Sequence, residues 1–308
     1  MKRILSIFLL FCLLLAGCGT QAAPAEGYSF SDDLDRTVTV ENPQRVAVLL
    51  GSFAQVWHLA GGTVCAAPDD AWEDLDLDLP EEAVNLGSTE QQSLELLLSA
   101  KPDLILASTN RRQNMQWLET LEATGIPTAY FGIDDFDDYL RMLKICTDLT
   151  GRADLYEKHG LQVQQQIDAV IEHSAARGTR PTVLCLTASA ATIRAQNSEG
   201  TVLGATLKTL GCENIADSDT MLLENLSLEH ILVRDPDFIF LVQRGDDPEG
   251  MQAYVEEALL SHPLWSQLTA VKTGQVHYMD KALFNLKPNH RWGEAYEILE
   301  EILENDET

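Results

Sequence analysis

Two stretches of sequence decide the fold: SLELLLSAKPDLILAS at residues 93–108 and SLEHILVRDPDFIFLV at residues 227–242. They carry Ser, Leu, Glu, Pro, Asp and Ile at matching places. In each copy a Ser precedes an apolar run as a helix N-cap, a Pro-Asp step ends the helix, and an apolar β-favouring run follows. The interval between the copies is far longer than the roughly 20–50 residues of a solenoid repeat. The sequence therefore predicts two related lobes.

Outward from these units, strands alternate with helices, which predicts parallel sheets. The predicted strands are 46–50, 63–67, 104–107 and 127–131 in the first half, and 182–187, 238–242 and 276–279 in the second. The predicted helices are 53–60, 94–100, 115–124, 202–210, 228–234, 251–260 and 292–303. We therefore predict an α/β fold with two Rossmann-like, doubly wound lobes.

The segment between the lobes has a different pattern. Residues 136–177 contain no strand signal and no Pro, and apolar residues recur near helical spacing at Leu155, Val163, Ile167, Val170 and Ile171. This predicts a long helix within 152–177, weakened at Gly160, that joins the lobes rigidly. The predicted division is an N-terminal lobe at 28–135, a helical connector at 136–178 and a C-terminal lobe at 179–308.

The N-terminus reads as a processing segment. Lys2 and Arg3 precede the apolar run 4–15, which is too short to span a membrane comfortably. Leu-Ala-Gly-Cys, ending at Cys18, resembles a bacterial lipobox, in which the Cys is lipidated and becomes the new N-terminus. We expect a signal peptide at 1–17, a flexible tether at 18–27, and an exported protein anchored by lipid to the outer face of the cell membrane.

Charge and cysteine content exclude several classes of function. The net charge of -27 disfavours nucleic acid and gives no attraction to anionic headgroups, so the lipid must provide the membrane attachment. Besides Cys12 and Cys18, the chain has four cysteines, none in a CxxC pair or a His/Cys cluster at zinc spacing. One disulfide remains open, but three of the four lie in apolar runs typical of buried free thiols: Cys65, Cys146 and Cys185. We expect no metal site and no cofactor.

At this point the chain resembles the substrate-binding lipoproteins of ABC importers in the iron-siderophore, haem and cobalamin class, the third class of periplasmic binding proteins. The resemblance rests on the lipobox, RVAV at 45–48 leading into Gly51-Ser52, both SLE…PD units, LGCENIA at 210–216, HPLW at 262–265 and KPNHRW at 287–292. These motifs occur in order over nearly the whole mature chain.

The resemblance implies a monomeric, non-catalytic binder with a ligand cleft between its lobes and little hinge closure. Its expected partners are a permease dimer with ATPase subunits. Glu95 and Glu229 match the glutamates that dock into arginine pockets of the permease in this family. A second interpretation stays open, because both lie in the first turn of a helix, where the helix dipole favours a carboxylate by roughly 0.3–1 kcal/mol.

Candidate ligand contacts follow from the rule that open α/β sheets bind ligands beyond the carboxyl ends of their strands. Arginines recur there in an arginine-poor chain, and an Arg fork suits anionic oxygens such as those of ferric siderophores or haem. Each of the five candidate arginines could instead be a solvated surface charge, so we expect only two or three of them to line the cleft. Arg111 and Arg112 are adjacent, so we do not expect both to point inward. Aromatic residues would provide stacking surfaces. The candidates are Ser52, Trp72, Arg111, Arg112, Tyr130, Arg194, Arg244, Phe284 and Arg291.

His290 is a minor candidate for an axial ligand of haem iron or cobalt, although a His beside Pro-Asn is more often a cap or a surface residue. The sequence has no GxSxG elbow and no HExxH motif, so it does not support a serine-dependent or metal-dependent hydrolase. We expect capture of a ferric siderophore without catalysis. A haem or cobalamin binder of the same class, an oxyanion binder, and a lipid-anchored ligand-sensing domain remain alternatives.

Overall fold

The N-terminal lobe is built on a five-stranded parallel sheet in the order β5-β4-β3-β6-β7. Its strands are β3 (Val46–Val48), β4 (Val64–Ala67), β5 (Val84–Asn85), β6 (Leu104–Ser108) and β7 (Thr128–Phe131). Every residue of β3, β6 and β7 is buried, because helices cover both faces of the sheet. This explains the unbroken apolar runs in the sequence. The computed structural model describes residues 27–245 and 247–304, so the predicted signal peptide and Cys18 lie outside the described residues.

Five helices belong to this lobe: α2 (Gly51–Leu59), α3 (Asp70–Glu73), α4 (Leu94–Ser99), α5 (Arg112–Gln116) and α6 (Leu118–Thr124). The predicted helix 115–124 is thus two helices that meet at Trp117. An antiparallel hairpin of β1 (Tyr28–Ser31) and β2 (Thr37–Val40) was not predicted. The Tyr28 hydroxyl donates a hydrogen bond of 2.8 Å to Asp148 and ties this hairpin to the connector.

The C-terminal lobe repeats the parallel plan, with strand order β10-β8-β11-β12. Its strands are β8 (Thr182–Ala188), β9 (Ile193–Gln196), β10 (Glu213–Asn214), β11 (Phe238–Gln243) and β12 (Val276–Met279). Strand β9, which was not predicted, pairs with β8 antiparallel, whereas the other strands of this sheet are parallel. A tight turn causes this reversal, since the Ser189 N–H donates to the Thr192 carbonyl at 2.8 Å.

The longer helices around this sheet are α10 (Val202–Thr209), α12 (Leu228–Arg234), α13 (Pro248–Val255) and α16 (Trp292–Glu304). Shorter ones are η2 (Ile215–Asp217), α11 (Thr220–Glu224), η3 (Glu256–Leu260), η4 (Trp265–Gln267), α14 (Thr269–Lys272), α15 (Lys281–Phe284) and η5 (Asn289–Arg291).

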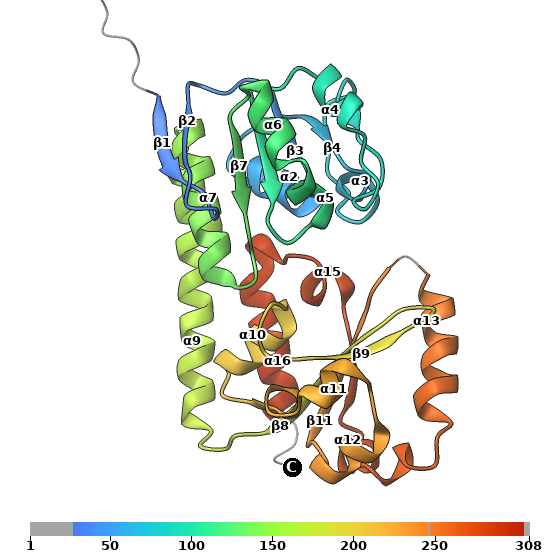
Figure 1. Ribbon diagram of the computed structural model, residues 1–308. Coiled ribbons are helices and arrows are strands. Elements are labelled where there is room, and N and C mark those ends of the chain that lie inside the picture. The colour runs from blue at the N-terminus through green and yellow to red at the C-terminus, as the bar shows by residue number, and fades with distance from the viewer. Residues whose placement is uncertain (1–26, 246, 305–308) are drawn as a thin grey trace, which may run out of the picture.

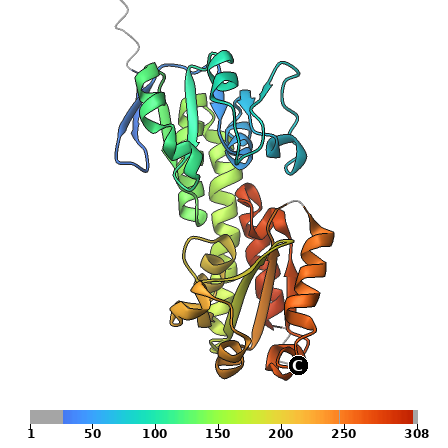
Figure 2. The same ribbon diagram turned by 45° about the vertical axis from the view of Figure 1, so that its right-hand side comes forward.

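The connector consists of α7 (Phe136–Thr150) followed by α8 (Ala153–Tyr156), the π-turn η1 (Glu157–Leu161) and α9 (Gln162–Ala176). The last three form one helical run that passes along both lobes (Figures 1 and 2). The predicted long helix is confirmed, and its predicted weak point, Gly160, lies in the π-turn. Gly160 is buried, and a Cβ there would lie 2.8 Å from Leu140 Cδ1, so a glycine lets α7 approach this closely.

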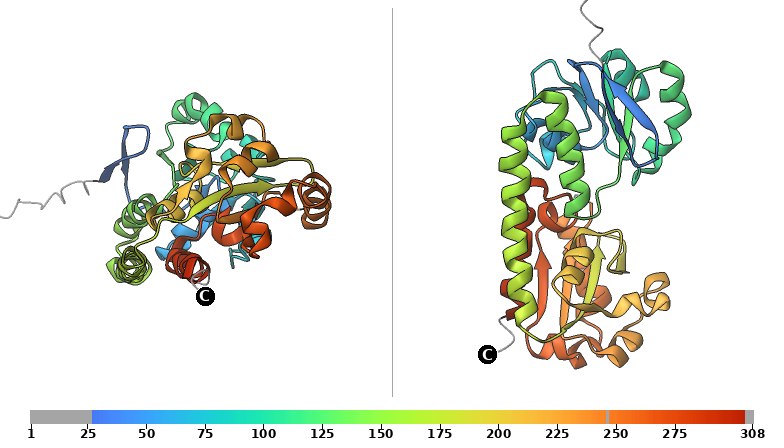
Figure 3. Two further views of the ribbon diagram at one scale, coloured as in Figure 1. Left: turned by 90° about the horizontal axis from the view of Figure 1, so that it is seen from below. Right: turned by 90° about the vertical axis from the view of Figure 1, so that its left-hand side faces the viewer.

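The main apolar core is continuous across the connector and both lobes. At its centre the rings of Phe136 and Trp292 meet edge to face, 6.4 Å apart. Helix α16 packs along α9, as the side view in Figure 3 shows. A shared core of this kind opposes large hinge motion. No helix in the described ranges has the length and apolarity that spanning a membrane requires.

The four described cysteines are free, which confirms the predicted thiols. Cys146, Cys185 and Cys212 are buried, and Cys65 is partly buried. Burial raises the pKa of all four thiols, for Cys212 to about 12, because the thiolate would lose its hydration. These thiols are therefore packing residues.

Candidate ligand-binding cleft

A cavity of about 460 Å³ lies between the two lobes. The N-terminal lobe contributes residues that follow β4, β5 and β6: Asp69, Asp70, Glu73, Asp74, Ser88, Thr89, Glu90 and Arg111. The C-terminal lobe contributes residues at or after β8, β9, β11 and β12: Thr187, Gln196, Thr201, Arg244, Gly245, Lys281, Asn285 and Leu286. The cavity thus occupies the carboxyl ends of both parallel sheets, where the strand-end rule places a ligand.

The N-terminal wall of the cavity is acidic. Five carboxylates line it beside one arginine: Asp69, Asp70, Glu73, Asp74, Glu90 and Arg111. Both carboxylate oxygens of Asp70 accept from the Gly51 N–H at 3.1 Å, at the first turn of α2. Burial raises the pKa of Asp70 to about 6, against the opposing effects of this hydrogen bond and of Arg111. Asp70 therefore changes charge just below neutral pH.

The C-terminal wall is basic and polar. It presents Arg244 and Lys281 together with neutral side chains, among which Gln196 Nε2 donates to Thr187 Oγ1 at 3.1 Å. An adjoining cavity of about 100 Å³ shares Thr187 and Gln196 and reaches deeper into this lobe, to Phe284 and Lys287. The pocket therefore combines an anionic face with a cationic one.

Among the residues that the structure describes, three polar links join the lobes around the cleft. Lys281 Nζ lies 3.0 Å from an Asp74 oxygen, and Lys287 Nζ lies 3.6 Å from an oxygen of Asp134. Burial lowers the pKa of Lys287, because its ammonium group is largely removed from water.

Asn289 makes the third link and is fully buried. Its Nδ2 donates to the Ser52 carbonyl oxygen at 2.9 Å and to Gln55 Oε1 at 2.8 Å. Its φ of 53° is left-handed, a conformation that Asn tolerates better than most residues. Asn289 therefore fixes the last segment of the chain against the N-terminal lobe.

Three of the nine predicted ligand contacts lie at these cavities. Arg111 and Arg244 line the main cavity from opposite lobes, and Phe284 lines the adjoining one. Arg112, which is exposed on α5, does not line the main cavity, in line with the expectation that it and Arg111 cannot both point inward.

The structure places the other predicted contacts elsewhere. Tyr130 is fully buried under Arg36, and its hydroxyl donates to the Asn114 carbonyl, so its ring has no free face. Ser52 is buried in α2, and Trp72 packs against the main core. Arg194 lines an outer groove of the C-terminal lobe.

Two candidates near the C-terminus are held by local contacts. Arg291 makes a two-pronged ion pair with Glu294, with hydrogen bonds of 2.7 and 2.8 Å. The ring of His290 lies 5.9 Å from that of His159, away from the residues that line the cavity. Burial lowers the pKa of His290, with a further contribution from Arg291.

The acidic wall and Lys281 were missed, although the sequence contained the signal for them. The strand-end rule, applied after the predicted strand 63–67, leads directly to Asp69 and Asp70. Applied after 276–279, it leads to Lys281.

Glu95 and Glu229 occupy equivalent places in the two lobes. Each is exposed, and each follows a Ser whose side chain accepts a backbone N–H of the first turn, in α4 and α12. In Figure 1 these helices lie toward the outer ends of their lobes, on the side away from α9. The Ser227 hydroxyl donates to Glu229 at 2.9 Å, and local hydrogen bonds lower the pKa of Glu229. The capping and docking interpretations both fit this geometry.

Known proteins resemble the chain over most of its length. It is 29% identical over 299 residues to the Fe(3+)-citrate-binding protein YfmC of Bacillus subtilis, a match that covers 90% of this chain and 89% of that protein. It is 29% identical over 235 residues to a vitamin B12-binding protein of Pectobacterium atrosepticum, covering 70% of this chain and 78% of that one.

The fold matches that of Staphylococcus aureus SirA, solved in complex with staphyloferrin B. The TM-score is 0.71 at 21% identity, and the match covers 90% of this chain and 98% of SirA. The family profile described as periplasmic binding protein matches residues 46–283, which include the sheets of both lobes and all of the described cleft lining except Asn285 and Leu286. The chain therefore belongs to the periplasmic binding protein family.

Proposed function

We propose that this protein is the extracytoplasmic substrate-binding lipoprotein of an ABC importer and that it captures a hydrophilic ferric chelate of the siderophore type. The observation that carries the proposal is the charged cavity of about 460 Å³ between the lobes. It lies at the carboxyl ends of both sheets, and Arg111, Arg244 and Lys281 line it beside neutral hydrogen-bonding side chains that suit an oxygen-rich chelate. The protein delivers the chelate unchanged and catalyses no reaction.

The lining supports a polar chelate over the two macrocycles. Among the described lining residues of the main cavity, eight carry a formal charge and none is aromatic: Asp69, Asp70, Glu73, Asp74, Glu90, Arg111, Arg244 and Lys281. Haem would bury a large apolar face against these charges at a high desolvation cost. For cobalamin, the described cavity lining lacks the flat apolar surfaces that usually line a macrocycle site. The ferric chelates named for YfmC and SirA carry anionic oxygens that suit Arg111 and Arg244.

The remaining parts of the proposal concern the setting. Lipid at Cys18 holds the monomeric protein at the outer face of the membrane. Glu95 and Glu229 dock onto arginine pockets of the two permease subunits, one for each lobe. The exposure of both glutamates and their equivalent positions after a Ser N-cap support this role.

Titration of the purified, untagged protein tests the ligand class. Ferric citrate, ferric carboxylate, catecholate and hydroxamate siderophores, haem and cobalamin are added in turn while tryptophan fluorescence is followed. We expect saturable quenching with a ferric oxygen chelate and unchanged chelate after dissociation. Tighter binding of haem or cobalamin would overturn the assignment to a hydrophilic chelate, and no response to any of them would overturn the whole class.

A further inference from the structure

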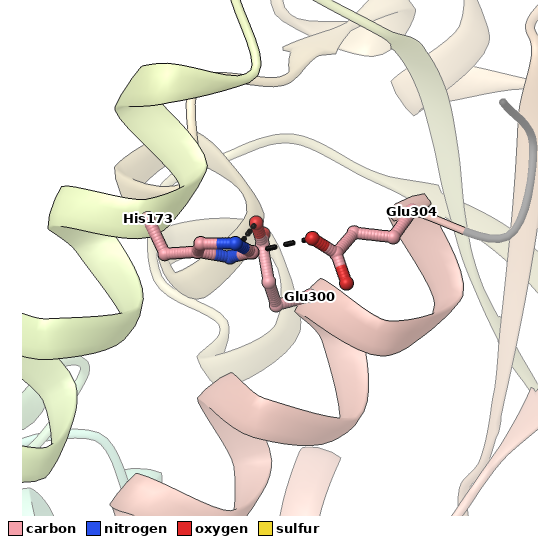
Figure 4. Close-up of side chains that lie close together, drawn as sticks. All are labelled: His173, Glu300 and Glu304. Carbon is pink, nitrogen blue, oxygen red and sulfur yellow. Dashed lines mark ion pairs between the residues drawn. The ribbon is translucent and has the colours of Figure 1, made fainter.

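A cluster of three potential metal ligands lies where the connector helix α9 packs against α16 of the C-terminal lobe. His173 comes from α9, and Glu300 and Glu304 come from the neighbouring helix α16 (Figure 4). None of the three lines the cleft. The proposed importer function therefore leaves this cluster unexplained.

Local geometry brings the three side chains together. Glu300 and Glu304 are four residues apart and so project from the same face of α16. Gly293, one of the buried residues of α16, allows the two helices to approach closely, since a Cβ there would lie 2.0 Å from Gln166 Oε1 of α9. His173 then reaches across to the carboxylates.

The distances match those of a metal coordination shell. His173 Nδ1 lies 3.4 Å from Glu300 Oε1 and 3.3 Å from Glu304 Oε1, and the three ligand atoms all lie within 4.8 Å of one another. Zinc bonds of about 2.0–2.2 Å in a tetrahedron place neighbouring ligand atoms about 3.3–3.5 Å apart. The two measured nitrogen–oxygen distances fall at this value.

The state of Glu300 is a separate indication of a ligand. Its side chain is only 7% exposed, and Oε1, which is aimed at His173, is buried without a hydrogen-bond partner. The other oxygen, Oε2, accepts a 2.9 Å hydrogen bond from the equally buried Arg177. A ligand carboxylate held in this way by a neighbouring donor is typical of metal sites.

The cluster is also open to solvent on one side. The side chains of His173 and Glu304 are 62% and 50% exposed. An ion can therefore enter without rearrangement of the helices, and water can complete its coordination. The mixed set of one imidazole and two carboxylates suits a divalent transition-metal ion better than calcium or magnesium, which prefer oxygen ligands alone.

We propose that His173, Glu300 and Glu304 bind a divalent transition-metal ion, with zinc the best match. The bound ion links the connector helix to the C-terminal helix. Its effect is to stabilise the packing of α9 against α16, independently of ligand capture in the cleft.

Equilibrium dialysis of the untagged, EDTA-treated protein against Zn²⁺ tests the proposal. We expect the wild type to bind one Zn²⁺ per chain. Both His173→Ala and Glu304→Gln should raise the Kd for this ion at least tenfold. These two positions are exposed, so both variants should fold, which circular dichroism checks. Glu172→Gln, which removes an exposed carboxylate beside His173, is the matched control and should bind as the wild type does.

Two further measurements separate this site from the acidic cleft. Co²⁺ should give the strong visible absorption of a tetrahedral site in the wild type and in Glu73→Gln, but not in His173→Ala. Zn²⁺ at ten times its Kd should raise Tm by about 2–4 °C in the wild type and leave His173→Ala unchanged. Absence of saturable Zn²⁺ binding, or binding equally strong in His173→Ala and Glu304→Gln, would overturn the proposal.

Discussion

The two lobes share one architecture but present opposite charges to the ligand. Residues after β4 and β5 of the N-terminal lobe bring five carboxylates to the cleft, whereas residues after β11 and β12 of the C-terminal lobe bring Arg244 and Lys281. The described lining of the C-terminal lobe contains no carboxylate. The duplicated scaffold thus supplies equivalent positions, and the loops that follow each strand supply the chemistry.

This asymmetry has two physical consequences. The walls attract each other, and an ion pair between Asp74 and Lys281 joins them across the cleft. Under the proposed function the ligand is also oriented, with its anionic oxygens toward Arg244 on the basic wall and Arg111 within the acidic wall, and its hydrogen-bond donors toward the carboxylates. The outer surfaces, in contrast, carry equivalent glutamates, so the lobes should differ in capture and act alike in docking.

The largest effect is expected from charge reversal at the outer ends. The double variant Glu95→Lys/Glu229→Lys should reduce chelate uptake by cells to background while leaving Kd unchanged, because repulsion replaces attraction at both permease subunits. If the lobes dock equally, the two single reversals give similar partial losses. Uptake assays with labelled chelate measure this. Glu119→Lys and Glu257→Lys, at exposed positions in the two lobes, are the controls. Full uptake by the double variant would favour a ligand-sensing role.

The next effect concerns ligand affinity. Arg111→Ala and Arg244→Ala should each weaken binding of an anionic chelate by about 10–100-fold, since a hydrogen bond to a charged group contributes about 1.5–3 kcal/mol. Fluorescence titration measures the Kd of both variants and so compares the contributions of the two walls to ligand binding. Arg112→Ala, one residue from Arg111 but outside the described lining, should bind normally. An equal loss in Arg112→Ala would contradict the assignment of the cavity as the binding site.

Asn289 tests the joint between the lobes. Asn289→Ala should lower the free energy of unfolding by about 2–3 kcal/mol, because it removes the buried hydrogen bonds to the Ser52 carbonyl and to Gln55 and places Ala in a left-handed conformation. Urea denaturation measures the change. Asn289→Gly relieves the conformational strain but does not restore the hydrogen bonds, so it should recover only a minor share of the lost free energy of unfolding. Asn225→Ala, at an exposed position, is the control. A loss below about 0.5 kcal/mol in Asn289→Ala would show that the link is dispensable.

Asp70 makes the acidic wall sensitive to pH. Its pKa is raised from 3.8 to about 6, so the folded state holds a proton that the unfolded state has lost. Its contribution to stability therefore increases as pH falls from 7 to 5 and is lost as pH rises through 6. We expect the gain from pH 7 to 5 to be larger in the wild type than in Asp70→Asn by on the order of 1 kcal/mol, allowing for partial exposure.

Urea denaturation at the two pH values measures this difference. Asp69→Asn is the matched control, because it removes a charge from the same wall without contacting Gly51. An identical pH dependence in Asp70→Asn and the wild type would contradict the role of Asp70.

The smallest effect is expected from the bridge between the walls. A double-mutant cycle of Asp74→Asn and Lys281→Met should give a coupling of about 0.5 kcal/mol, weaker in high salt, because the pair is partly exposed. A cycle is needed because the Lys281 side chain has further interactions. A coupling that does not change with salt would mean that the walls are not held together by charge.

The fold was predictable because each of its main elements has a local signature. The Ser N-cap, the Pro-Asp step and the apolar run recur in both lobes, and α12 begins and ends at the predicted residues. The hairpin β1–β2 and strand β9 escaped prediction because their sequences, YSFS, TVTV and IRAQ, lack the continuous apolar run that marks the buried parallel strands.

The position of the cleft was predictable, but the direction of single side chains was not. Strand ends located Arg111 and Arg244, whereas Tyr130 and Ser52 depend on which face of a strand or helix the tertiary packing buries. The metal-ligand cluster could not be predicted at all, because His173 and Glu300 are far apart in sequence and meet only where α9 packs on α16. Their roles in this protein remain predictions to be tested by the variants above.

The separation of the two sheets along the chain also affects the order in which the protein can fold. All strands of the N-terminal sheet come from residues 46–131 and all those of the C-terminal sheet from 182–279, so neither sheet has to wait for a strand from the other half of the chain. During synthesis the N-terminal half emerges first and can complete its sheet while the rest is still being translated. Helix α16, the last to arrive, then packs along α9 and joins the two finished halves.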